Sequence, residues 1–109
     1  MKKYELTGET IRAINGTKLY RIRAINNFGG LRVGFPGGFI ESEDNLSHDG
    51  NCWIYGDSQV YGDAWVSDNA VIDDEISISG KVVVTGNIRL TGRMTILGDG
   101  IISPKIWPG

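Results

Sequence analysis

Residues 54–102 have the sequence IYGDSQVYGDAWVSDNAVIDDEISISGKVVVTGNIRLTGRMTILGDGII, in which every sixth residue is aliphatic. The nine positions are Ile54, Val60, Val66, Ile72, Ile78, Val84, Leu90, Ile96 and Ile102. Because a fixed period is the signature of a repeat architecture, this run predicts that one short structural unit recurs through the second half of the chain.

Two other positions of the six-residue unit support this prediction. Two residues after each aliphatic position, from Gly56 to Gly98, stands glycine or aspartate, which tolerate a positive φ and therefore suit a corner. Four residues after it stands a small or apolar residue, beginning with Ser58. The unit is thus a short strand, such as residues 64–66, followed by a corner; its two outer residues point inward and its middle residue points outward.

A strict six-residue period with short strands resembles the left-handed parallel β-helix, the hexapeptide-repeat fold, which is a known exception to right-handed crossovers. The resemblance implies that three hexads make one triangular coil. We therefore expect an all-β protein with a short left-handed parallel β-helix of about three coils, at residues 54–71, 72–89 and 90–107. The inward residues would form three stacks: Ile54/Ile72/Leu90, Val60/Ile78/Ile96 and Val66/Val84/Ile102.

The charge distribution suggests a division of the chain near residue 47. Residues 1–47 hold seven basic and five acidic residues, whereas residues 48–109 hold four and eight. Within the first part, Asn15-Gly16 is a typical two-residue hairpin turn, so residues 9–25 are predicted to form a β-hairpin. We expect residues 1–47 to be an N-terminal hairpin and loop cap that covers the open first coil, and residues 48–109 to be the β-helix.

A second resemblance covers most of the chain. It rests on the stretches GGFIESEDNLS at residues 37–47 and GNCWIY at residues 50–55, together with YRIRA at residues 20–24. These stretches resemble bacterial and prophage hexapeptide-repeat proteins of the YdcK-like type. That resemblance implies a bacterial or phage setting and transfers no defined activity.

Composition excludes several classes of protein. A chain of 109 residues is one domain, with at most a small appendage, and its net charge of −2 argues against nucleic acid or an anionic membrane as the partner. No apolar run approaches the roughly 18 residues of a membrane span, and Cys52 is the single cysteine. We expect a cytoplasmic protein, in the host cytoplasm if it is phage-encoded.

Many hexapeptide-repeat proteins are acyltransferases, and the resemblance implies a catalytic histidine at a cleft between subunits. The single histidine, His48, lies before the repeats, which run on without an insertion. His48 and the adjacent Asp49 are poorly spaced for a base and its orienting carboxylate. Cys52 is expected to be a buried small residue, and it cannot form a zinc site with His48 alone. We therefore predict no enzymatic activity, catalytic residue, cofactor or metal.

One outward column of the predicted β-helix, Trp65/Val83/Ile101, is entirely apolar. Solvated faces seldom carry such a column, so we expect it to be covered by a second copy, by the N-terminal segment or by another protein. A neighbouring column ends at Trp107. The main hypothesis is a non-catalytic protein-binding or self-assembling module, a dimer or trimer, whose contact residues are Trp65, Val83, Ile101 and Trp107.

Two alternatives stay open. One is a small phage-encoded inhibitor that binds a host protein complex, such as a defence enzyme. The other is a reduced hexapeptide-repeat acyltransferase, which predicts binding of acyl-coenzyme A.

Overall fold

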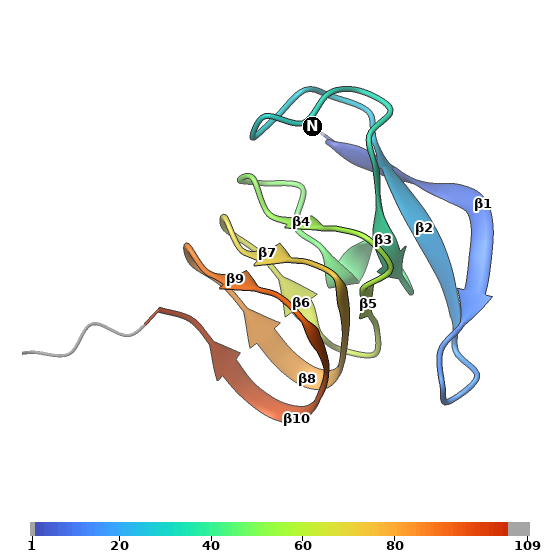
Figure 1. The fold of residues 1–109 in the computed structure, drawn as a ribbon, viewed down its shortest axis with the longest axis vertical. Coiled ribbons are helices and arrows are strands. Elements are labelled where there is room, and N and C mark those ends of the chain that lie inside the picture. Colours follow the sequence, from blue (N-terminus) through green and yellow to red (C-terminus); the bar gives the residue numbers. More distant parts are fainter. Residues whose placement is uncertain (1, 105–109) are drawn as a thin grey trace, which may run out of the picture.

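The computed structural model describes residues 2–104, which form a parallel β-solenoid with an antiparallel hairpin at one end (Figure 1). The strands are β1 (Tyr4–Arg12), β2 (Lys18–Ala24), β3 (Pro36–Ile40), β4 (Trp53–Ile54), β5 (Gln59–Val60), β6 (Trp65–Val66), β7 (Val71–Ile72), β8 (Glu75–Val84), β9 (Arg89–Leu90) and β10 (Arg93–Ile102). A 3₁₀ turn, η1 (Glu43–Asn45), precedes β4. This part of the chain contains no helix with the length and apolar character needed to cross a membrane.

The register of the parallel strands confirms the 18-residue coil. Gln59 pairs with Ser77 and Trp65 with Val83, and the whole of β10 pairs with β8 at the same separation. Strands β4, β7 and β9 form a separate sheet on a third side. The all-β parallel β-helix is therefore confirmed, and its inward columns align as the repeat predicts.

The solenoid has about four turns, where the sequence predicted about three. The additional turn comes from residues that were assigned to the cap. Strand β3 pairs in parallel with β5, with Phe39 opposite Gln59, and Leu46 forms a bridge with Val66. The repeat pattern did not identify this turn because its inward residues, Ile40 and Leu46, are six residues apart but lie two residues out of phase with the run that starts at Ile54. The ladder is continuous across residue 47, and the division into two domains stays a prediction.

The hairpin closes the first end of the ladder. Strands β1 and β2 are antiparallel and meet at the turn that contains Asn15 and Gly16. Strand β2 then pairs with β3, so the edge of the first turn is covered, as predicted for the cap. On the outer face, Leu19 of β2 joins Phe39 and Tyr61 in a small buried cluster.

The corners adopt the left-handed backbone conformation at the predicted position of each unit. Asp68 and Asp74 have φ of 58° and 66°, and the glycines at the equivalent positions also have positive φ. At Gly80 the successive coils approach so closely that a Cβ would lie 2.5 Å from the carbonyl oxygen of Gly98. The repeat of glycine and aspartate therefore sets both the bend and the spacing of the coils.

The inward columns make one continuous core. Ile54, Val60, Val66, Ile72, Ile78 and Val84 are fully buried. In the last turn, Leu90, Ile96 and Ile102 are only partly buried, since no further coil covers them within residues 2–104. Burial thus falls from the hairpin end of the solenoid toward β10.

Ile78 lies at the centre of this core, paired with Val60 below and Ile96 above. Ile78→Ala should lower the free energy of unfolding by about 2–5 kcal/mol, because it leaves a cavity that the stacked coils cannot fill. Ile14→Ala is the matched control, since Ile14 is 99% exposed at the hairpin tip. Equal denaturation midpoints for the two variants would contradict the assigned core.

Candidate functional site

His48 lies at the corner where the repeat is interrupted. Leu46 pairs with Val66 at a separation of 20 residues, whereas Trp53 pairs with Val71 at 18, so two extra residues lie between Leu46 and Trp53. These residues make a longer corner, at residues 47–52, which contains His48. The sequence pattern from residue 54 onward has no insertion, and the one interruption precedes it.

A carboxylate holds the His48 ring. Its Nε2 lies 2.7 Å from Oε1 of Glu43, and its Nδ1 accepts a hydrogen bond of 3.1 Å from the backbone N–H of Lys3. This pattern places the proton of the neutral ring on Nε2. The ring also stacks on Tyr4, with centroids 4.1 Å apart. His48 therefore has an oriented ring, and its second nitrogen is covered by the N-terminal strand.

The turn η1 places Glu43. Ser42 caps the turn by accepting a hydrogen bond from the N–H of Asp44, and the Oδ1 of Asn45 accepts one from the backbone N–H of Ser42. Asn45 also donates to the carbonyl of Ala64, which anchors the turn to the solenoid. Glu43 is thereby directed at His48. Asp49 was the candidate for this position in the sequence, because adjacency to His48 was the only visible signal.

Hydrogen bonds from His48 and then from Lys2 lower the pKa of Glu43 below its ordinary value. The Lys2 Nζ lies 3.1 Å from the second carboxylate oxygen. The carboxylate is therefore ionised at neutral pH and can stabilise a positive charge on the His48 ring.

Lys3 and Cys52 form a buried contact behind the histidine. The Lys3 Nζ donates to the carbonyl oxygen of Cys52 at 2.8 Å, to that of Gly50 at 3.2 Å and to the Cys52 Sγ at 3.3 Å. Burial lowers the pKa of Lys3 and raises the pKa of the Cys52 thiol. Cys52 is fully buried, as the repeat predicted, and these contacts fasten the start of the chain to the long corner.

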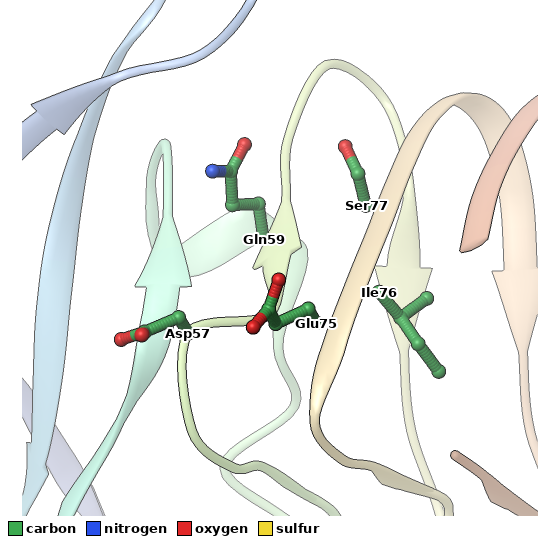
Figure 2. A pocket seen from close by; sticks show the side chains of 5 residues that line it. All are labelled: Asp57, Gln59, Glu75, Ile76 and Ser77. Carbon is green, nitrogen blue, oxygen red and sulfur yellow. The ribbon is translucent and has the colours of Figure 1, made fainter. Parts of the chain in front are cut away.

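A hollow of about 290 Å³ lies on the side of the solenoid formed by β5 and β8 (Figure 2). It is lined by Asp57, Gln59, Glu75, Ile76 and Ser77. Within residues 2–104 no three side chains of the metal-binding types converge. The two carboxylates make this hollow a poor match for the polyphosphate of coenzyme A.

The two arginines Arg89 and Arg93 of the solenoid do not form a phosphate-binding site for coenzyme A either. The Nη2 of Arg89 lies 2.7 Å from Oδ2 of Asp73, and the Nε of Arg93 lies 3.2 Å from Oε2 of Glu75. Each guanidinium already faces a carboxylate, which competes with a phosphate for it. Neither this hollow nor these two arginines therefore supplies an unpaired cationic group for the phosphates of coenzyme A.

The predicted contact residues lie in one column where the structure describes them. Trp65, Val83 and Ile101 are aligned across three turns. Trp65 and Val83 are half-buried, whereas Ile101 is 71% exposed. Trp107 lies outside the described residues. The alignment of the column is confirmed, and its role in contacts with another protein stays a prediction.

No protein-family model matches the chain. Part of it is similar to the Escherichia coli (strain K12) protein named "Uncharacterized acetyltransferase YdcK", with 43% identity over 63 residues. The match covers 50% of this chain and 19% of that protein, so the chain spans about a fifth of the length of this relative.

This similarity changes one prediction and supports another. The prediction of a protein without enzymatic activity is contradicted, because the relative is named as an acetyltransferase. The similarity supports the resemblance to YdcK-like hexapeptide-repeat proteins over this part of the chain. It does not bear on the predicted prophage setting.

Glu43→Gln tests the assigned carboxylate through the pH dependence of stability. Since the pKa of Glu43 is lowered in the folded state, its ionised form stabilises the fold above pH 4.5, the ordinary value. This contribution is lost as the pH falls through the lowered folded-state pKa. Denaturation at several pH values should therefore show a shallower acid dependence for Glu43→Gln than for the wild type. Asp44→Asn is the control, and a wild-type acid dependence in Glu43→Gln would contradict the contact.

Proposed function

We propose that this chain is an acyltransferase-like β-solenoid that takes part in the transfer of an acetyl group. The observation that carries the proposal is the 43% identity to a protein named as an acetyltransferase. The parallel β-solenoid supports it, because this is the fold implied by the resemblance to hexapeptide-repeat acyltransferases. Since the chain corresponds to 19% of the relative, the activity, substrate and partners of that whole protein belong to the proposal.

His48 is the general base in this proposal. Glu43 orients the ring and stabilises its positive charge, while Nδ1 takes the proton from the hydroxyl or amine of the acceptor. In the described conformation Nδ1 is engaged by the N–H of Lys3, so the acceptor must displace this contact. The proton moves to Nδ1 as the acceptor oxygen or nitrogen bonds to the acyl carbon. The bond between that carbon and the leaving group of the acyl donor then breaks, and the leaving group takes up the proton from Nδ1.

The activity can be measured as the release of free thiol from acetyl-coenzyme A with hydroxyl and amine acceptors. We expect turnover by the wild type and a decrease of at least about a hundredfold in His48→Asn, because general base catalysis typically contributes that much. Asp49→Asn is the matched control, since Asp49 is exposed next to His48. Absence of turnover by the wild type, with no heat of binding of acetyl-coenzyme A in calorimetry, would reject the proposal.

A second proposal concerns the column Trp65/Val83/Ile101, which we propose as a contact face for another protein chain. The observation in its favour is the exposure of Ile101 at 71%, at the end of an apolar column. A large aromatic side chain such as Trp65 is the type of residue that dominates binding at an interface. The second chain is either a copy of this one or another protein.

Trp65→Glu should abolish any association through this face and leave the fold intact. The side chain points away from the core, so its replacement by a carboxylate opposes burial against a partner without disturbing the inward stacks. Gln59→Glu is the control on the adjacent side of the solenoid, in a polar column. Unchanged association of Trp65→Glu in light scattering would remove this face from consideration.

A further inference from the structure

Both ring nitrogens of His48 are occupied in this structure. The neutral ring carries its proton on Nε2, which faces Glu43, so Nδ1 holds the lone pair that can accept a proton from a substrate. That lone pair already accepts a hydrogen bond of 3.1 Å from the backbone N–H of Lys3. The described conformation of the site is therefore closed to an acceptor.

Two residues, Lys2 and Lys3, close the site, and we call them the strap. They lie just before β1, whose ladder with β2 begins at Tyr4. Tyr4 is fully buried, and its hydroxyl donates a hydrogen bond of 2.6 Å to the carbonyl oxygen of Leu46. The strap is therefore anchored at Tyr4, and it can move without breaking the ladder of the hairpin.

The outer contacts of the strap are weak. The ammonium of Lys2 pairs with Glu43, but the two side chains are 64% and 40% exposed, and exposed ion pairs contribute little to stability. The side chain of Asn26 donates to the carbonyl oxygen of Lys2, and the N–H of Ile25 donates to that of Lys3. Closure of the strap therefore depends mainly on the side chain of Lys3.

The side chain of Lys3 fastens the strap to the long corner. Its Nζ donates to the carbonyl oxygens of Gly50 and Cys52 and to the Cys52 Sγ, and it lies 4.8 Å from the centre of the Phe28 ring. The residue is only 4% exposed, so the ammonium has lost most of its hydration, and burial lowers the pKa of Lys3. These partners offset the cost of burying the charge, which regains water when the strap leaves. Closure is thus a balance of two opposing contributions that a change at Lys3 can shift.

We propose that the strap is an autoinhibitory element, which blocks Nδ1 of His48 until it swings away at Tyr4, and that Lys3 is its latch. The inhibitory role rests on the proposed acetyl transfer, whereas closure is a property of the folded chain that can be measured without an acyl donor. Because only open molecules admit an acceptor, the rate of transfer scales with the open fraction.

Diethyl pyrocarbonate measures closure directly, because it acylates the unprotonated nitrogen of a histidine ring. His48 is the single histidine, so the ultraviolet absorbance of carbethoxyhistidine reports one residue. We expect the folded wild type to react at least about tenfold more slowly than the urea-denatured chain at the same pH, since only the open fraction reacts. Equal rates for the folded and denatured wild type would overturn the closed strap.

Lys3→Glu tests the latch. The new carboxylate would face the carbonyl oxygens of Gly50 and Cys52, so we expect the strap to open and His48 to react at least about tenfold faster than in the wild type. Lys18→Glu is the matched control, since Lys18 is an exposed lysine of the hairpin, and it should react at the wild-type rate. A wild-type rate in Lys3→Glu, or an equal acceleration in Lys18→Glu, would overturn Lys3 as the latch.

Asn26→Ala loosens the strap without placing a charge in the core, and it decides the outcome if Lys3→Glu fails to fold. It removes the hydrogen bond to the carbonyl oxygen of Lys2, so His48 should react faster while the denaturation midpoint stays close to that of the wild type. An unchanged rate in this variant would contradict the strap.

Acetyl transfer is measured separately on the same proteins. Where the wild type turns over, Lys3→Glu should raise kcat/KM, and an unchanged or lower value would overturn the inhibitory role. A wild type that is protected from diethyl pyrocarbonate but shows no turnover would reject the proposed function and confirm the closure of the strap.

Discussion

The structure depends on a left-handed corner that recurs every six residues. Asp68, Asp74 and the equivalent glycines take a positive φ two residues after an inward aliphatic side chain. Three such corners return the chain to its starting side after 18 residues, which puts Val60 under Ile78 and Val66 under Val84. The backbone of each coil then bonds to the next, and the aliphatic columns exclude water. The bend at each corner, the hydrogen bonds between coils and the aliphatic core therefore all follow from the six-residue spacing.

The candidate site lies where this spacing is broken. Two extra residues between Leu46 and Trp53 enlarge one corner, and the start of the chain fills it. Lys3 supplies a backbone N–H to His48 and a buried ammonium group to Cys52, while η1 supplies Glu43. A regular solenoid offers flat, repetitive sides, so an irregular corner is where side chains from three segments can converge. This is the physical reason for placing the proposed general base there.

The periodic part of the chain was predictable from the sequence, whereas its first turn and its site were not. In residues 54–102 the sequence alone shows which side chains point inward and which form corners. This is because aliphatic residues recur at one position of the six-residue unit and glycine or aspartate at another. Ile40 and Leu46 occupy the core at the same six-residue spacing, but the two extra residues before Trp53 put them out of phase with that run. Glu43 was missed because its approach to His48 depends on the capped turn η1 and not on adjacency in the sequence. The sequence also left the activity undecided, and similarity to a named acetyltransferase corrected the expectation of a non-enzyme.

The central claim, that three hexads close one turn, is tested most directly by interstrand nuclear Overhauser contacts in the isotope-labelled chain. The account predicts backbone contacts between residues 18 apart, including Gln59 with Ser77, Trp65 with Val83 and Val71 with Arg89. It also predicts that these contacts follow a parallel pattern. Contacts at another constant separation, or antiparallel contacts between successive hexads, would contradict the coil and with it the placement of the site.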